Sequence, residues 1–258
     1  MITRLEAFAV PGLPIVGAGD DLAALLTSAL DASGRELCAG DVVMVTSKIV
    51  SRAEGRFVDL SSVNPSAAAL DLAREVAGDP RLVELVLSES AGISRKRHGA
   101  LVVRHRLGFV TANAGIDLSN SVPPGAAEGS GPWALLLPTD PDGAAERLRR
   151  ALRPDGALAV IVTDSFGRPF RVGTVGVAIG VAGLRPLLDQ RGEVDLFGRT
   201  LVHTVAARAD QLAALSDLVA GQSVERQPVV VVRGVDFAPV EGASARELCR
   251  PADGDLYA

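Results

Sequence analysis

The chain has 258 residues and a formal net charge of −5, with two cysteines and three histidines. Its length suits one large domain or two small ones. The mixed charges argue against a broad nucleic-acid surface. The two cysteines are far apart in the sequence, which argues against a disulfide scaffold or a zinc cluster. No apolar run approaches the roughly 18 residues that a membrane helix needs. We expect a single domain over residues 1–258, with room for two sub-domains, in a cytoplasmic protein that acts on small molecules and binds neither nucleic acid nor membrane.

Helices and strands alternate along the first half of the chain. An amphipathic helix is predicted first, with leucines at helical spacing behind Asp20 or Asp21 as its cap. Further helices follow Asn64-Pro65 and Asp79-Pro80, because Asn or Asp caps the free amides of a helix start and proline needs no N–H there. In chain order, elements are predicted at residues 19–34 (helix), 42–45 (strand), 65–78 and 80–90 (helices), and 100–105 and 108–115 (strands).

The second half begins with residues 120–132, which are rich in Pro, Gly and Ser and are predicted to form a mobile loop able to act as a lid. Asp140-Pro141 then marks another helix start. The remaining elements are predicted at residues 141–152 (helix), 157–164 and 199–207 (strands), 206–221 (helix) and 227–234 (strand). This mixture, without a fixed repeat, predicts an α/β fold of the mixed α+β type.

Several familiar catalytic motifs do not occur. The sequence contains no G-x-x-x-x-G-K-[ST] and no G-x-S-x-G. The glycines between residues 173 and 183 indicate close packing of small residues rather than a dinucleotide site, and each histidine is expected to be structural. The basic segment 94–106 is either a solvated hairpin or an anion-binding element.

Polar residues follow two predicted strands. Asp117 precedes Ser119 and Asn120, and Asp164 precedes Ser165. Oxygen ligands of this kind suit Mg²⁺ or Mn²⁺, which take one or two carboxylates and fill their other positions with phosphate and water. Taken singly, each aspartate is also typical of a turn or a helix cap.

Arginines follow the second of these aspartates. A turn or a helix start after the strand would bring Arg168 and Arg171 close to Asp164, and carboxylates beside guanidinium groups are the charge pattern of a phosphoryl-transfer site. At another strand end, Ser47, Lys48 and Arg52 suit phosphate contact, although a solvated loop explains them nearly as well.

Six stretches together resemble one family, the coenzyme F420-0:L-glutamate ligases, which are the gamma-glutamyl ligases of the deazaflavin cofactor. They run in the family's order over nearly the whole chain from about Gly12, and the chain stops where some relatives continue into a flavin-binding domain, so we expect a stand-alone ligase domain. The six stretches are GLPIVGAGDDLAALL, GDVVMVTSKIVSRAEGRFV, GFVTANAGIDLSNS, VIVTDSFGRPFRVG, AIGVAGLRPLLDQRGEVDLFGRTL and PVVVVRG.

The resemblance implies a mixed α/β fold particular to the family, an intertwined homodimer, and a GTP-dependent reaction assisted by Mg²⁺ or Mn²⁺ and stimulated by K⁺. GTP would contact Leu13, Pro14, Ile15, Val16, Ser47, Arg52 and Asn120. Asp117 and Asp164 would hold one divalent cation, and Ser165, with Gln222, a second. Independently of the resemblance, the positions of Arg168 and Arg171 after Asp164 predict that they clamp phosphates beside the catalytic aspartates.

Four positions depart from the family pattern. Arg52 replaces a common lysine, Thr174 and Val177 stand where glutamine and aspartate are expected, and Gln222 replaces an acidic residue in some relatives. The expected function is a GTP-dependent amide ligase that joins L-glutamate to the carboxylate of the deazaflavin precursor through an acyl phosphate and can add further glutamates. The alternatives are a catalytically silent GTP-binding relative and a ligase for another amino acid or acceptor.

Overall fold

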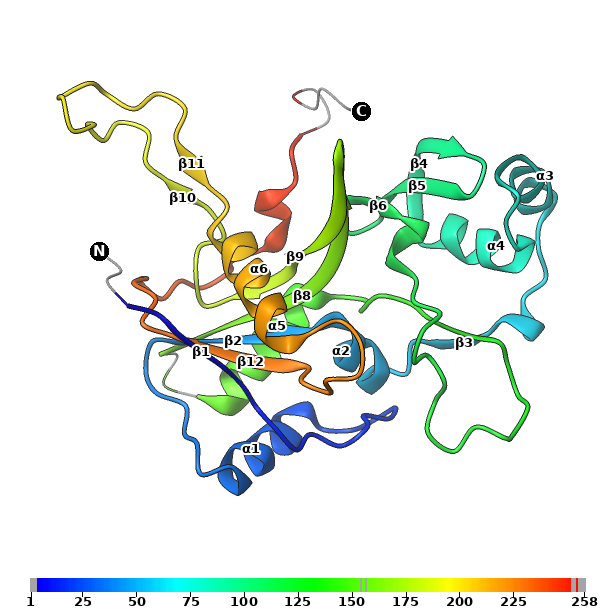
Figure 1. Cartoon of the computed structure of the whole chain (residues 1–258), viewed down its shortest axis with the longest axis horizontal. Helices are drawn as coiled ribbons and strands as arrows, with labels where there is room; N and C mark the ends of the chain where they lie inside the picture. Colours follow the sequence, from blue (N-terminus) through cyan, green and yellow to red (C-terminus); the bar gives the residue numbers. More distant parts are fainter. Residues whose placement is uncertain (1–3, 154, 156, 252–253, 255–258) are drawn as a thin grey trace.

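A five-stranded sheet forms the centre of the computed structural model, which describes residues 4–153, 155, 157–251 and 254 (Figure 1). The strand order is β1-β12-β2-β8-β9, and only β2 and β8 are parallel neighbours. The strands are β1 (Glu6–Ala9), β2 (Asp41–Thr46), β8 (Leu158–Arg168), β9 (Arg171–Ala182) and β12 (Val229–Arg233). Thr46 pairs with Thr163, so the residues that follow both strands meet at one edge of the sheet.

Helices cover both faces of this sheet, which explains why the strands read as continuous apolar runs. Val43 and Val160 pack towards one helical layer, while Met44 and Ile161 pack towards the other. The first layer contains α1 (Leu22–Ala32), α2 (Ser47–Ala53) and α5 (Pro141–Leu152); the second contains α6 (Arg208–Ala220) and the short η3 (Ala245–Leu248). Among the residues described, no helix is long and apolar enough to cross a membrane.

A second lobe lies to one side of the central sheet (Figure 1). It has its own apolar cluster, in which Leu72, Val86 and Val103 are buried. The lobe contains α3 (Ala67–Val76), α4 (Pro80–Ser88), β4 (Ser90–Arg97), β5 (Ala100–His105), β6 (Val110–Ala112) and η2 (Asn113–Gly115). The segments β3 (Phe57–Asp59), η1 (Leu60–Ser62) and β7 (Trp133–Leu135) connect it to the sheet, with β3 and β7 paired.

The predicted mixed α/β class is confirmed, and most helix starts agree with the sequence. Asp21, Asp79 and Asp140 each cap a helix by accepting bonds from backbone amides. The cap predicted at Asn64 is wrong, because α3 begins later and Ser66 accepts the bond from the Ala69 amide. The basic segment 94–106 lies in the β4–β5 hairpin, which agrees with the hairpin predicted for it; an anion-binding role for this segment stays a prediction.

Two predicted strands are much shorter than expected. Residues 108–115 divide into β6 and η2, and of residues 199–207 only β11 (Val205–Ala206) is a strand, paired with β10 (Leu188–Asp189). The residues between β10 and β11 form an arm that projects from the body (Figure 1) and is closed by its own backbone bonds, such as that from the Gly192 amide to the Leu201 carbonyl at 2.9 Å. Beyond the β10–β11 pair, Val194 and Thr200 form an isolated antiparallel bridge within the arm.

The strand β8 continues beyond Asp164, so the turn or helix start predicted at this point is wrong. Asp164 pairs with Val177 of β9, and the pairing runs on until Arg168 meets Arg171 at the hairpin tip. Of the glycines predicted to pack closely, Gly176, Gly180 and Gly183 do so, whereas Gly173 has open space around it. A Cβ atom on Gly176 would lie 2.4 Å from the Ala213 carbonyl oxygen, so the glycine lets β9 approach α6.

Candidate active site

The ends of the parallel strands β2 and β8 bring the first predicted site residues together. Ser47 begins α2 directly after β2, and Asp164 extends from β8 one residue past the last pair of the parallel ladder. The Ser47 hydroxyl donates to Asp164 Oδ1 at 3.3 Å. These residues are 117 positions apart in the sequence and meet because neighbouring parallel strands end at the same edge.

Asp117 enters the same region from the connection between η2 and β7. Its backbone pairs with Leu135, and its side chain lies against Lys48, with Lys48 Nζ 2.5 Å from Asp117 Oδ2. The amide and the hydroxyl of Ser119 both donate to Asp117 Oδ1 at 2.8 Å. Lys48 also donates to the Ser119 carbonyl oxygen at 3.0 Å, which fixes the ammonium between the two residues. Lys48 is therefore part of this cluster rather than of a solvated loop.

The charge of Asp164 is poorly compensated within the protein. Burial of its carboxyl raises the pKa of Asp164 to about 7, and the negative charge of Asp117 adds to this rise. The bonds from the Ser165 amide and the Ser47 hydroxyl, and the positive charge of Lys48, oppose it only in part. A bound cation would favour the ionised carboxylate.

The donor set fits one hard divalent cation. Two carboxylates, Asp117 and Asp164, converge with the Ser47 hydroxyl, and all three supply oxygen. Such a set suits Mg²⁺ or Mn²⁺, which bind one or two protein carboxylates and keep water or phosphate in the remaining positions. Across the described residues, no group of three or more His, Cys, Asp or Glu side chains is placed to hold a metal by itself.

Ser165 belongs to a different cluster. Successive side chains of a strand point to opposite faces, so Ser165 faces α6 whereas Asp164 faces α2. The Ser165 hydroxyl lies 3.2 Å from Gln222 Oε1 and 3.0 Å from Gln222 Nε2, and it donates to Asp217 Oδ2 at 3.4 Å. The pair predicted for a second cation, Ser165 and Gln222, is thus joined by a carboxylate that the sequence analysis missed.

Asp217 could have been found from helical spacing. Asp210 and Asp217 are seven residues apart in α6, so both lie on the face towards β9. Asp210 accepts a bond from the Ala178 amide at 2.9 Å, which satisfies the outer edge of β9, whereas Asp217 faces Ser165. Burial raises the pKa of both carboxyls.

Arg52 links the predicted nucleotide residues to one another. Its guanidinium is buried and donates to the carbonyl oxygens of Val16 at 2.7 Å, Asn120 at 2.8 Å and Val122 at 3.3 Å. Burial lowers its pKa. It therefore ties the segment from Leu13 to Val16 to the start of the loop over residues 120–132, with Leu13 half-buried, Val16 buried, and Pro14 and Ile15 exposed. Their contacts with a nucleotide remain predictions.

The two arginines predicted to lie beside Asp164 do not. Arg168 and Arg171 face each other at the tip of the β8–β9 hairpin. At a rise of about 3.3 Å per residue, Arg168 stands roughly 13 Å along the strand from Asp164. The correction follows from the continuing strand, because an extended chain carries residues away from the site that a helical turn would have kept near. Thr174 pairs with Gly167 near the tip, and Val177 pairs with Asp164 itself.

Comparison with known proteins agrees with this arrangement. Residues 12–234 match the family F420-0:Gamma-glutamyl ligase. Three similar proteins are coenzyme F420:L-glutamate ligases. That of Methanothermobacter thermautotrophicus is 46% identical over 256 residues, which cover 98% of both chains. That of Natronomonas pharaonis is 45% identical over 258 residues (98% of this chain and 94% of the relative), and that of Methanopyrus kandleri is 42% identical over 244 residues (93% of this chain and 92% of the relative). A match of this extent covers every strand and helix that builds the two clusters. The chain belongs to the F420-0:gamma-glutamyl ligase family and is an enzyme of the ligase class.

Proposed function

We propose that this protein is a GTP-dependent ligase that joins L-glutamate to the carboxylate of coenzyme F420-0, the phospholactyl or phosphoenolpyruvyl form of the deazaflavin. The names of its relatives support the glutamate and the deazaflavin as substrates. The observation that carries the proposal is the meeting of Asp117, Asp164, Ser47 and Lys48 where β2 and β8 end. Paired carboxylates next to an ammonium and a hydroxyl suit the transfer of a phosphoryl group.

The reaction proceeds in two balanced steps. The acceptor carboxylate oxygen attacks the γ-phosphorus of GTP, the bond from that phosphorus to the bridging oxygen breaks, and GDP leaves. The glutamate nitrogen then attacks the carbonyl carbon of the acyl phosphate, inorganic phosphate leaves with its oxygen, and the nitrogen loses its proton to solvent. Repeating both steps on the new γ-carboxylate, with one more GTP consumed each time, would lengthen the glutamate tail.

The residues of the site have distinct tasks. Asp117 and Asp164 would hold Mg²⁺ or Mn²⁺, which neutralises phosphate charge when bound. Lys48, held between Asp117 and Ser119, is positioned to contact a phosphate oxygen, and Ser47 keeps the Asp164 carboxylate in place. Arg52 holds the segment from Leu13 to Val16 next to Asn120, where we place the guanine nucleotide.

A second cation is proposed at Ser165 and Gln222. Because glutamine is neutral, the pair alone would bind a cation weakly, and Asp217 supplies the missing carboxylate at the same position. Stimulation by K⁺ is proposed from the family resemblance alone.

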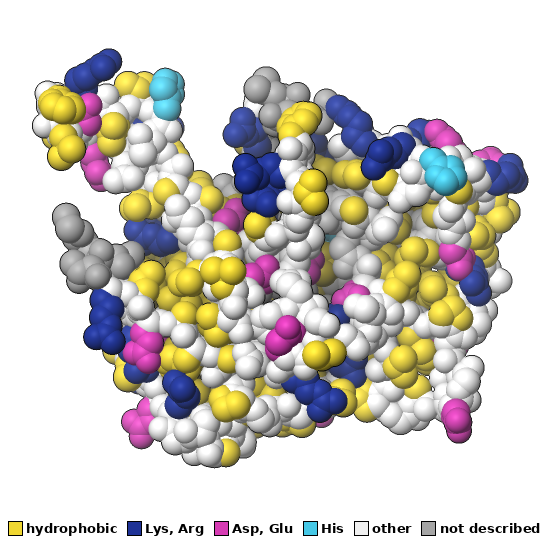
Figure 2. All heavy atoms as spheres, in the orientation of Figure 1, with side chains coloured by type: hydrophobic (Ala, Val, Ile, Leu, Met, Phe, Trp, Pro, Cys, Tyr) yellow, Lys and Arg dark blue, Asp and Glu magenta, His cyan; other side chains and the backbone are white. Residues whose placement is uncertain are grey.

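A homodimer is also proposed. Apolar side chains gather on the arm between β10 and β11, visible at the upper left of Figure 2, and such exposed apolar groups are typical of an interaction surface. Arg168 and Arg171 stand far from the Asp164 of their own chain, so their proposed role as phosphate clamps requires the site of a partner. We place the protein in the cytoplasm, where its free cysteines, Cys38 and Cys249, stay reduced.

Mass spectrometry tests the proposed reaction directly. The protein is incubated with GTP, Mg²⁺ or Mn²⁺, L-glutamate and coenzyme F420-0, and we expect an acceptor heavier by one glutamyl residue, with one GDP released for each. Further additions would appear as a ladder of the same mass. Reactions without GTP, with ATP in its place, or with chelator serve as controls. Absence of both the mass gain and GDP release would refute the proposal.

Two alternative functions are kept because Thr174, Val177 and Gln222 depart from the family pattern. A silent relative would bind GTP in a calorimeter and leave it intact. A ligase for another amino acid or acceptor would release GDP only when a substrate panel contained the correct pair. Either result would replace the function proposed above.

A further inference from the structure

A cavity of about 500 Å³ lies along the free edge of β9. Its walls come from the β5–β6 connection, the start of α5, the middle of β8 and β9, and the chain from η3 to Arg250. This size falls in the range of about 300–1,000 Å³ that is usual for small-molecule sites. None of the residues predicted from the family to bind GTP or a metal lines it.

The cavity lies next to the carboxylate cluster along the sheet. Val177, which lines the cavity, is the strand partner of Asp164. Phe166, also in its wall, follows Asp164 by two positions on the same face of β8, about 6.6 Å along the strand. A molecule in the cavity could therefore extend a short arm past Val177 to the point where Asp117 and Asp164 converge.

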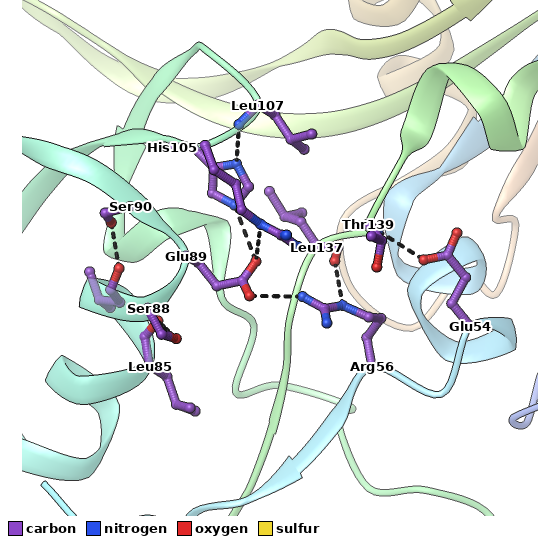
Figure 3. Close-up of polar contacts among 12 residues, drawn as sticks. Glu54, Arg56, Leu85, Ser88, Glu89, Ser90, His105, Leu107, Leu137 and Thr139 are labelled. Carbon is purple, nitrogen blue, oxygen red and sulfur yellow. Dashed lines mark hydrogen bonds and ion pairs between the residues drawn. The ribbon is translucent and has the colours of Figure 1, made fainter.

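One wall of the cavity is aromatic. Phe109 and Phe166 lie with ring centroids 5.0 Å apart, and Phe109 stacks on the buried His105 ring at 5.1 Å and 9°. The His105 ring is fixed in turn, since its Nδ1 accepts a bond from the Leu107 amide at 3.0 Å (Figure 3). The chain has only seven phenylalanines, so two in one wall provide an uncommon aromatic surface for this protein.

The remaining walls combine apolar side chains with charges of both signs. Arg104, Arg246 and Arg250 supply guanidinium donors, and Asp140, Asp142 and Asp210 supply carboxylates. One Asp210 oxygen accepts from the Ala178 amide. A planar ring that carries carbonyl oxygens and an N–H would match such a lining, because arginine donates to carbonyls and aspartate accepts from the N–H.

We propose that this β9-edge cavity binds the deazaflavin ring system of the acceptor, with the ribityl phosphate arm extending past Val177 so that its carboxylate reaches the site of phosphoryl transfer. The inference rests on the function proposed above. An aromatic wall and a volume of about 500 Å³ fit a three-ring system better than free glutamate, which has no ring to stack. The nucleotide is placed elsewhere, at the segment that Arg52 anchors.

Two substitutions test the cavity in the full-length protein. Arg246→Ala removes an exposed guanidinium, together with its long bond of 3.4 Å to the Arg106 carbonyl, and Val177→Phe fills the cavity next to Asp164. Titration of coenzyme F420-0 by its own fluorescence, without GTP, should show a dissociation constant raised about 10-fold by Arg246→Ala and more by Val177→Phe. The dissociation constant for GTP should change less than twofold. Arg74→Ala, an exposed arginine on α3, is the matched control and should change neither.

The possible outcomes separate this inference from the proposed function. Acceptor binding unchanged in both variants, with ligation intact in the unaltered protein, would overturn the cavity assignment alone. A raised KM for glutamate with unchanged acceptor binding would assign the cavity to the amino acid and also overturn it. Failure of the unaltered protein to bind or ligate the acceptor would overturn both proposals. Thermal melting of each variant checks the fold. If Val177→Phe has a lowered melting temperature, acceptor binding by Arg246→Ala alone tests the cavity assignment.

Discussion

The two carboxylates of the site differ in how their charge is balanced. Asp117 has the Lys48 ammonium at 2.5 Å and two donors from Ser119. The donors that touch Asp164 are neutral, namely the Ser47 hydroxyl and the Ser165 amide. Asp164 is therefore the carboxylate that depends more on a bound cation. Its replacement should reduce the rate of ligation while leaving the fold intact.

Asp164→Asn should abolish ligation without unfolding the protein. The amide keeps the shape of the side chain but binds a divalent cation weakly, so we expect kcat to fall on the order of 100-fold or more. Thermal melting of the protein without metal should not be lowered, because an enclosed amide needs no counter-charge. The control is Asp71→Asn on the exposed face of α3. A near-normal rate in Asp164→Asn would remove the metal assignment.

Glu89 joins the second lobe to the central sheet through charge. Arg56 and Arg106 each donate to its carboxylate at 2.9 Å, and Arg56 also donates to the Leu137 carbonyl at 3.0 Å (Figure 3). Burial by itself would raise the pKa of Glu89, but the contact with His105 and the charges of Arg56 and Arg106 outweigh it and lower the pKa to about 2. The ionised form is thus the one that the fold stabilises.

This shift predicts how stability depends on pH. The pKa of Glu89 lies below the ordinary value of 4.5, so its contribution of roughly 3 kcal/mol is complete above about pH 4.5 and is lost as the pH falls towards 2. Urea unfolding should show Glu89→Gln less stable by about that amount at pH 7, with the difference shrinking below pH 4.5.

The control for Glu89 is an exposed ion pair. Glu75→Gln breaks the pair with Lys96 on the surface and should cost at most about 1 kcal/mol, with little dependence on pH. An equal loss in both variants, or a Glu89→Gln difference that persists at pH 3, would contradict the role given to Glu89.

At the scale of elements, β9 determines how closely the two helical layers approach the sheet. A Cβ atom on Gly180 would lie 2.4 Å from the backbone of Pro141 at the start of α5, and one on Gly176 would reach the backbone of α6 at the same distance. Backbone atoms cannot move aside as a flexible side chain can. β9 is therefore held by close contact on both faces, with Gly176 and Gly180 at the contact points.

Gly180→Ala should destabilise the protein by about 2 kcal/mol or more, because α5 must move away from the sheet to admit the methyl group. Gly167→Ala on the same hairpin is the matched control, since no atom lies within 4 Å of its added Cβ, and its effect should stay within about 0.5 kcal/mol. Urea unfolding measures both. Equal stability of the two variants would show that α5 is not in contact with β9 as described.

At the scale of the whole molecule, the arm between β10 and β11 carries its apolar side chains outside every hydrophobic core of the described chain. Leu196 is 97% exposed and Phe197 90%. Val172 near the hairpin tip is fully exposed as well. Exposed apolar groups on two projecting segments are typical of an interaction surface and support the homodimer proposed above.

Light scattering after size exclusion should therefore give twice the mass of one chain. Replacing both Leu196 and Phe197 by aspartate should shift the protein to monomers, because a charged group in an apolar interface loses its hydration. Leu70→Asp, at an exposed apolar position on α3, is the control and should leave the dimer intact. A monomer in the unaltered protein would contradict the homodimer proposal and, with it, the clamping role of Arg168 and Arg171.

Local signals in the sequence were sufficient for most elements. Helix caps at Asp21, Asp79 and Asp140 follow from bonds within a few residues, so a short stretch contains all the information they need. The strands of the central sheet are similarly evident, because burial on both faces requires continuous apolar runs such as residues 158–162. The sequence also indicated Asp117 and Asp164 as polar groups next to strands.

What the sequence by itself determined is the order and type of these elements, the family, and the presence of carboxylates next to two strands. Only the tertiary structure decided which partners those groups have: Lys48 joins Asp117, Asp217 joins Ser165, and Arg168 is carried away from Asp164. The reason is physical. Caps and apolar periodicity depend on neighbours in the chain, whereas strand length, sheet order and the side chains that meet across them depend on contacts between residues as far apart as Ser47 and Asp164.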